Sequence, residues 1–221
     1  MTINLSLPAE QLAAYTASQL NNLFPDNQSV CVESLMRSMP QVLERLEYCF
    51  SHIEKKYYCE QGQVIFSHLN SDHYASYLYF LSNQLAKDGA ATSLCEKVFY
   101  LNKALHGLDL FYSIKMPDIF LLVHPIGTVI GNASFDDYLV IYQNCTIGSG
   151  HEGIYPSFGR GAILYSGVSV IGDCQIGDNC VFGAGAQLVM QSVANDSVIV
   201  GTGKAVRILP NNLSVLDRAF R

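Results

Sequence analysis

The sequence has few charged residues and no apolar run long enough to cross a membrane. Charged residues make up 14% of the 221 positions and hydrophobic residues 49%, with a mean hydropathy of +0.19. No stretch reaches the ~18 uninterrupted apolar residues that a membrane span requires. The apolar excess therefore favours interfaces between subunits, and we expect no membrane partner.

The chain also lacks a basic excess, closely paired cysteines and a signal sequence. Its formal net charge of -6 disfavours nucleic acids and anionic membranes as partners. The seven cysteines form no Cys-x-x-Cys motif, and Met1–Asn4 lacks the features of a signal peptide. These absences predict a cytoplasmic protein with reduced cysteines. His68 and His73 are five positions apart, a poor spacing for one helical face, so we expect packing or surface roles and no metal site.

What the second half of the chain does have is an apolar residue at every sixth position. A period of six matches neither a helix nor a strand, but it fits a solenoid whose triangular coil has three short faces. An ordinary β-rich domain could show this six-residue period by chance. Here, however, small residues recur with the same period, at a constant offset from the apolar ones. The apolar positions are Phe135, Ile141, Ile147, Phe158, Leu164, Val170, Ile176, Phe182 and Leu188, and the small ones are Ala162, Val168, Cys174, Cys180 and Ala186. We predict a left-handed parallel β-helix of hexapeptide repeats, with Cys174 and Cys180 as buried packing residues.

The first half of the chain has helical patterns. The predicted class is α+β, with a helical N-terminal domain over residues 1–106, the β-helix over 107–209 and a C-terminal tail over 210–221. Within the tract before residue 107, proline at position 40 is expected to interrupt or bend one helix. The expected helices lie near Leu12–Leu23, Val30–Tyr57, His73–Leu85 (capped by Asn70–Asp72) and Thr92–Leu105.

One break in the repeat and several motifs point to a known family. The step from Ile147 to Phe158 is eleven positions where one face needs six, so Gly148–Pro156 is expected to leave the coil as a loop. His124–Gly131 parallels the His-Ala-Thr-Gly-Ile-Val-Ile-Gly stretch of the serine O-acetyltransferases, a branch of the hexapeptide acyltransferases. Further parallels are Gly183–Ala186 and Gly201–Ala205. The chain resembles that family over roughly residues 60–209.

The resemblance implies an acetyl-CoA-dependent O-acetyltransferase, most simply one that acetylates serine in the first step of cysteine synthesis. The family pairs the motif histidine with an aspartate fifteen residues earlier, and here that position is Asp109. His124 would then act as general base and Asp109 would fix its tautomer, while backbone N–H groups hold the oxyanion. Direct attack by the acceptor is implied, so no cysteine or serine nucleophile is needed. In the alternative reading, His124 is a structural histidine and Asp109 a corner residue.

The cosubstrate is expected in the groove between adjacent β-helices. Small residues there would let pantetheine approach the backbone, and Lys204 would contact a phosphate unless it is simply a solvated lysine. We therefore expect a homotrimer, which the helical halves could pair into a hexamer. The residues assigned to CoA binding are Ser166, Gly167, Gly183, Ala184, Gly185 and Lys204.

The acceptor pocket departs from the family pattern. The family has Arg-His-Pro at the end of the loop, whereas this chain has Ile154-Tyr155-Pro156, and Val123 stands where the family has aspartate. We assign Tyr155 to the catalytic site as a contact to the acceptor hydroxyl, and His151 to acceptor binding. The loss of groups for a carboxylate and an amine keeps two alternatives open. One is a sugar O-acetyltransferase that modifies a surface polysaccharide precursor, and the other is a non-catalytic CoA-binding or scaffold β-helix.

Overall fold

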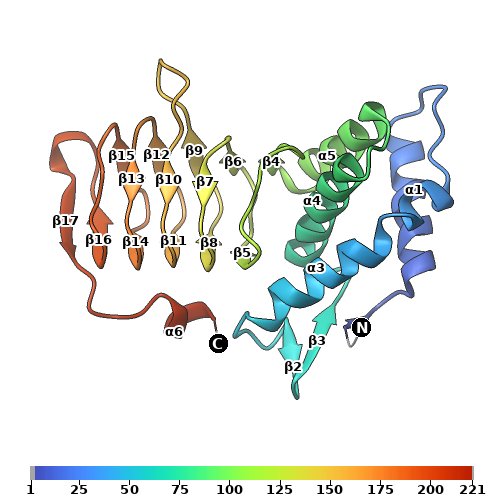
Figure 1. Cartoon of the computed structure of the whole chain (residues 1–221), viewed down its shortest axis with the longest axis horizontal. Coiled ribbons are helices and arrows are strands. Elements are labelled where there is room, and N and C mark those ends of the chain that lie inside the picture. The colour runs from blue at the N-terminus through green and yellow to red at the C-terminus, as the bar shows by residue number, and fades with distance from the viewer. Residues whose placement is uncertain (1–2, 221) are drawn as a thin grey trace. The chain divides into compact units, whose positions relative to one another are not determined.

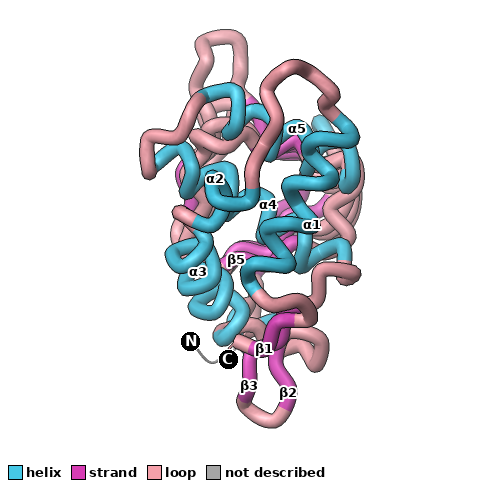
Figure 2. Tube along the Cα trace, turned by 90° about the vertical axis from the view of Figure 1, so that its right-hand side faces the viewer, coloured by secondary structure: helices cyan, strands magenta, loops and turns pink. Residues whose placement is uncertain are grey.

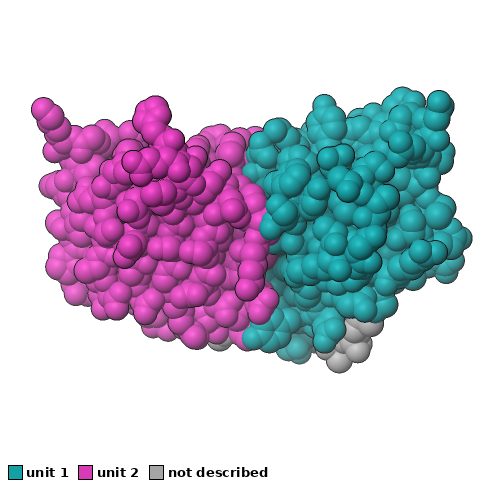
Figure 3. All heavy atoms as spheres, turned by 45° about the horizontal axis from the view of Figure 1, so that its top comes forward, with its two compact units in different colours: residues 1–51, 56–113 teal, residues 52–55, 114–221 magenta. Residues whose placement is uncertain are grey.

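The computed structural model of the chain describes residues 3–220. It divides into two compact units, distinguished by colour in Figure 3. The first unit contains the residues up to Ser51 together with Lys56–Ser113. The second contains His52–Lys55 and the residues from Ile114 onward.

The described part of the first unit contains five helices (Figure 1). The predicted helix from Val30 to Tyr57 is two helices, and it ends at Ser51, so its extension to Tyr57 was wrong. Pro40 is the second residue of the later helix, where its missing N–H breaks no helical bond. The helices are α1 (Ala9–Leu23), α2 (Val32–Met36), α3 (Met39–Ser51), α4 (Ser71–Lys87) and α5 (Thr92–His106).

Helix α4 is the core of this unit. The Asn70 side chain accepts from the N–H groups of Asp72 and His73, as the capping pattern predicts. Every residue from His73 to Leu85 is buried, because α4 packs against both α3 and α5. His73 itself lies among the rings of Phe50, Tyr58 and Phe66, which agrees with a packing role.

A small three-stranded sheet also belongs to the first unit. The strands β1 (Asn4–Leu5), β2 (Cys59–Glu60) and β3 (Gln63–Phe66) form a sheet in the order β1-β3-β2, visible beside the helices in Figure 2. These strands are two to four residues long, too short to produce a period, and the sequence analysis did not predict them.

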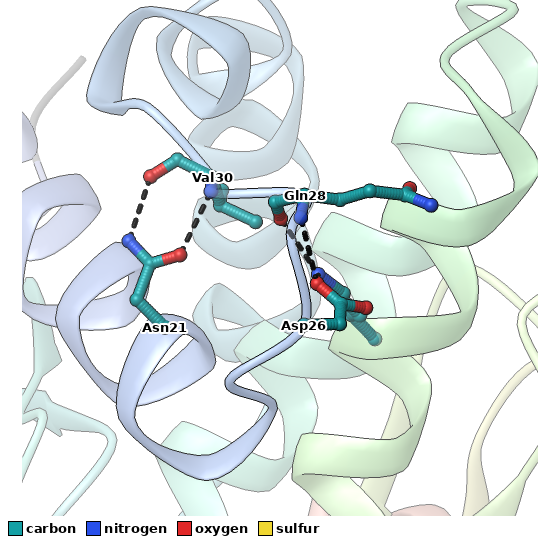
Figure 4. Close-up of polar contacts among 5 residues, drawn as sticks. Asn21, Asp26, Gln28 and Val30 are labelled. Carbon is teal, nitrogen blue, oxygen red and sulfur yellow. Dashed lines mark hydrogen bonds and ion pairs between the residues drawn. The ribbon is translucent and has the colours of Figure 1, made fainter.

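Polar contacts hold the loop after α1, as Figure 4 shows. Asn21 exchanges two hydrogen bonds with the backbone of Val30, at 2.9 and 2.8 Å. The largely buried Lys97 donates to the Asp26 carboxylate and to the Gln28 carbonyl. The hydrogen bond from Lys97 lowers the pKa of Asp26. The loop is thereby held between α1 and α5.

The second unit is a left-handed parallel β-helix with three ladders of short strands. The first ladder contains β5 (Phe120–Leu122), β8 (Leu139–Ile141), β11 (Ala162–Leu164), β14 (Cys180–Phe182) and β16 (Ser197–Val200). The second contains β6 (Val129–Ile130), β9 (Thr146–Gly148), β12 (Ser169–Ile171) and β15 (Gln187–Val189), and the third contains β7 (Ser134–Phe135), β10 (Ser157–Phe158) and β13 (Gln175–Ile176). The remaining short strand, β4 (Asp109–Leu110), follows α5 in the first unit.

The predicted registers describe how the coil is filled. Each apolar position from Ile141 to Leu188 is at most 4% exposed, and the five small positions are at most 1% exposed. Phe135 is half-buried and its ring stacks on that of Phe158, with centroids 5.3 Å apart. Cys174 and Cys180 face the interior as expected.

The loop leaves the coil without disturbing the ladders. Ser169 pairs with Gln187, eighteen positions later, whereas Thr146 pairs with Ser169, twenty-three positions later. The extra five residues belong to one turn, and the strands on both sides keep parallel register. The predicted loop therefore projects from an otherwise regular solenoid, as seen between β9 and β10 in Figure 1.

The end of the solenoid is closed by a reversal of chain direction. After β16 comes the short helix η1 (Gly203–Ala205), and then β17 (Arg207–Pro210) pairs antiparallel with β16. The final helix α6 (Leu216–Ala219) is preceded by Val215, whose N–H donates to the side chain of Asn179 at 2.8 Å. Among the helices that the structure describes, none has the length and apolar character of a membrane span.

Candidate functional site

The turns between the first and second ladders stack into one edge of the solenoid, here called the histidine corner. Its backbone forms a ladder from coil to coil. Asn144 N–H donates to the Ile126 carbonyl at 2.9 Å, and Gly185 N–H donates to the Ser166 carbonyl at 2.8 Å. The turns that make up this corner are residues 123–128, 142–145, 165–168 and 183–186. Residues 201–206, which join β16 to β17, follow at the same end of the strand, and the Gly201 carbonyl accepts from Gln187 N–H.

His124 opens this corner at its first turn. Its side chain is exposed, and its backbone has φ +49°, in the left-handed region that bulky residues seldom occupy. Two bonds fix this geometry: the His124 carbonyl accepts from Ile126 N–H at 2.6 Å, and Val123 N–H donates to the Ile141 carbonyl at 2.9 Å. The corner thus presents an imidazole to solvent on a constrained backbone.

The small residues assigned to CoA lie on later turns of the same corner. Gly167 (φ +74°) and Gly185 (φ +71°) both need a left-handed backbone. A Cβ on Gly185 would meet no atom within 4 Å, so the backbone there faces open space. Ala184 and Lys204 are exposed, while Ser166 and Gly183 are half-buried. An extended ligand could therefore lie directly against this backbone.

Asp109 belongs to the first unit, where it has a cationic neighbour that sequence reasoning missed. The Lys103 ammonium lies 2.7 Å from Asp109 Oδ2. The Asp109 side chain is 33% exposed and that of Lys103 is 47% exposed. Their six-residue spacing crosses the end of α5, and a periodic pattern carries no signal for such a contact.

The loop lies at another edge, between the second and third ladders. It is a tight hairpin in which Gly150 N–H donates to the Ile154 carbonyl at 3.1 Å. His151 is exposed at its tip. The Tyr155 ring instead folds back over Gly131, where a Cβ would overlap it. Tyr155 is therefore held on the coil and His151 projects from it.

A groove of about 470 Å³ runs beside the loop. Its walls are mostly apolar, and Val189 and Met190 are among the more exposed large apolar side chains of the chain. It carries no arginine or lysine, so neither of these side chains is available there to pair with a ligand carboxylate. The lining residues are Ser149, Gly150, His151, Glu152, Ile154, Ile171, Val189 and Met190.

Within one chain, the predicted site residues of the second unit therefore fall into two groups. His124 and the CoA-assigned residues share the histidine corner, whereas His151 and Tyr155 lie at the loop edge. The strands β6, β9, β12 and β15 lie between the two edges. A small acceptor at His124 is thus separated from the loop of its own chain by the width of one face.

The cysteines inside the coil are poorly suited to covalent chemistry. Cys145 and Cys180 are buried, and burial raises the pKa of both thiols. A thiol with a raised pKa is protonated at neutral pH and is a weak nucleophile. Across residues 3–220, no three His, Cys, Asp or Glu side chains gather closely enough to hold a metal ion.

Comparison with known proteins agrees with this architecture. Residues 155–188 match the family "Bacterial transferase hexapeptide (six repeats)". A serine acetyltransferase of Synechococcus elongatus is 31% identical over 108 residues, which is 46% of this chain and 43% of that protein. The chain spans less than half the length of the curated relatives it matches.

Solved structures resemble the chain over nearly its whole length. The serine acetyltransferase of Brucella abortus in complex with coenzyme A aligns with a TM-score of 0.69 and 18% identity, covering 95% of this chain and 84% of that one. The Neisseria gonorrhoeae serine acetyltransferase in complex with serine aligns with a TM-score of 0.71 and 20% identity, covering 90% and 83%. The chain therefore has the fold of the serine acetyltransferases.

Proposed function

We propose that this protein is an acetyl-CoA-dependent O-acetyltransferase, with serine as its acceptor. The observation that carries the proposal is the histidine corner, where an exposed imidazole and a strip of accessible backbone share one edge of a rigid solenoid. The fold and partial sequence match to serine acetyltransferases support the reaction class.

In this proposal His124 removes the proton from the acceptor hydroxyl as it attacks the thioester carbonyl. A neutral imidazole suits this task at neutral pH, because a hydroxyl alone is a very weak acid. Asp109 would accept from the other ring nitrogen, which fixes the tautomer and stabilises the imidazolium as it forms. The pairing of these two residues rests on their fifteen-residue spacing and on the family resemblance.

Coenzyme A would lie along the later turns of the histidine corner. The proposal draws on the free space over Gly185 and on the exposed Ala184, where pantetheine could reach backbone groups. Lys204, exposed in η1, would meet a phosphate. The CoA complex of the Brucella abortus protein, which has this fold, supports the choice of cosubstrate.

A complete site would then need a second copy of the chain. His124 and Tyr155 lie at different edges of one solenoid, so we propose a homotrimer in which the histidine corner of one chain faces the loop of the next. The apolar groove beside the loop and the overall apolar excess are consistent with such an interface. Pairing of two trimers through the helical halves would give a hexamer.

The acceptor is the least constrained part of the proposal. Ile154 and Val123 replace groups that would bind the carboxylate and amine of serine, and Arg160 or Glu152 would have to compensate. The serine complex of the Neisseria gonorrhoeae protein supports serine, whereas the absence of arginine and lysine from the groove favours a neutral sugar hydroxyl. A non-catalytic scaffold predicts no thiol release from acetyl-CoA with any acceptor.

The first prediction concerns the base. His124→Ala should lower acetyl transfer by about 10² or more with CoA affinity nearly unchanged, because proton removal is lost and the CoA contacts remain. Asp109→Asn should lower the rate of acetyl transfer by a smaller factor, since the general base His124 is kept. Thiol release from acetyl-CoA and calorimetry measure the two quantities. Unchanged transfer in His124→Ala would refute the mechanism, and His151 would become the next candidate.

The second prediction concerns the cosubstrate. Ala184→Phe should weaken CoA binding by at least about tenfold, because the ring would cover the backbone strip. Ala194→Phe is the matched control, since Ala194 is also an exposed alanine in a turn of the solenoid but lies at a different corner. Calorimetry with CoA compares the two variants. Equal affinities would show that CoA binds elsewhere.

The third prediction concerns assembly. Light scattering at micromolar concentration should give a mass of three chains, or six if the helical halves pair. A strict monomer would be incompatible with a site shared between copies.

The fourth prediction concerns the acceptor. The unmodified protein should acetylate serine with a high KM. The double variant Ile154→Arg, Tyr155→His should lower the KM for serine, because arginine can pair with the serine carboxylate. Initial rates over a serine titration give KM for both proteins. Efficient low-KM turnover by the unmodified chain would mean that other residues already bind the carboxylate.

A further inference from the structure

The last turn of α5 is anchored in the core of the first unit. Asn102 donates from Nδ2 to the Ala75 carbonyl of α4 at 2.9 Å, and its Oδ1 lies 2.8 Å from His106 Nδ1. Burial lowers the pKa of His106 to about 4, so the ring is neutral near pH 7 and its Nδ1–H donates to Asn102. The backbone that carries Lys103 is therefore fixed from two sides.

The chain then turns directly into the segment of Asp109. Gly107 caps α5 with φ +61°, and its N–H donates to the Lys103 carbonyl at 3.0 Å. This turn brings residues 103 and 109 together, and the Lys103 ammonium donates to Asp109 Oδ2 at 2.7 Å. A lysine in the last turn of a helix also has a purely structural explanation, since it complements the helix dipole.

We propose that Lys103 is a positioning residue for acetyl transfer, because through Oδ2 it holds in one orientation the Asp109 carboxylate that the proposed function assigns to the catalytic imidazole. This inference rests on the proposed function of His124 and Asp109. The Asp109 side chain is one-third exposed, so without Lys103 its carboxylate can rotate and hydrate. An imidazole whose acceptor is misplaced spends less time in the productive orientation.

Lys103 has two opposite effects on the rate: it orients the Asp109 carboxylate, and its positive charge weakens the stabilisation of the imidazolium by that carboxylate. The ammonium draws negative charge from the carboxylate, so its removal would strengthen the stabilisation of the imidazolium. The Lys103 side chain is exposed and that of Asp109 is partly exposed, however, and solvent screens such charge effects. Orientation should therefore dominate, and loss of Lys103 should reduce the rate.

The test compares Lys103→Met with Lys103→Arg and with Lys115→Met, which removes an exposed lysine that the proposal does not use. Lys103→Met should lower kcat about three- to tenfold with both KM values unchanged, because the proposal gives Lys103 no contact with either substrate. Lys103→Arg keeps a donor to Oδ2 and should restore kcat to within about twofold. Lys115→Met should match the unmodified protein. An unchanged or increased kcat in Lys103→Met overturns the proposal.

A second measurement separates positioning from helix stability. In the Asp109→Asn background, Lys103→Met should cause no further loss of kcat, since the two residues act as one unit. A merely structural lysine would give the same fractional loss in both backgrounds, which would also overturn the proposal. Failure of the proposed function is distinct from either result, because it would appear as activity that does not depend on His124.

Discussion

The hydrogen-bonded backbone ladder between successive coils is the interaction on which the site depends. Each strand pairs in parallel with the strand one coil away, so a turn in one coil stacks on the same turn of the next. His124, Ser166 and Ala184 are far apart in the sequence, yet this stacking places them on one edge. The same six-residue repeat therefore determines which apolar side chains fill the coil and which residues share the histidine corner.

The parts predicted from the sequence are those that a local pattern determines. The inward residues from Ile141 to Leu188 follow the six-residue period because each face can hold one large side chain. The start of α4 follows from Asn70, whose side chain satisfies two free N–H groups. The loop was found because five extra residues cannot fit on one face.

The parts that were missed depend on contacts between segments. The ion pair of Lys103 and Asp109 forms across a helix end, and neither residue alone differs from an ordinary surface charge. Strand β1 pairs with the distant β3, β2 and β3 form a tight hairpin, and all three strands are too short to show alternation. Tyr155 and His124 likewise lie in turns at different edges of the solenoid, which depends on how the strands fold into three faces.

The reversed strand β17 has a consequence for the solubility of the protein. A parallel solenoid ends in a row of unpaired backbone groups, and such an edge can template the addition of another chain. Here β17 pairs antiparallel with β16, and its first and last residues are Arg207 and Pro210. A charged side chain and a residue without an N–H both discourage further strand addition. The repeat that builds the site is thus prevented from continuing from this end into a fibre.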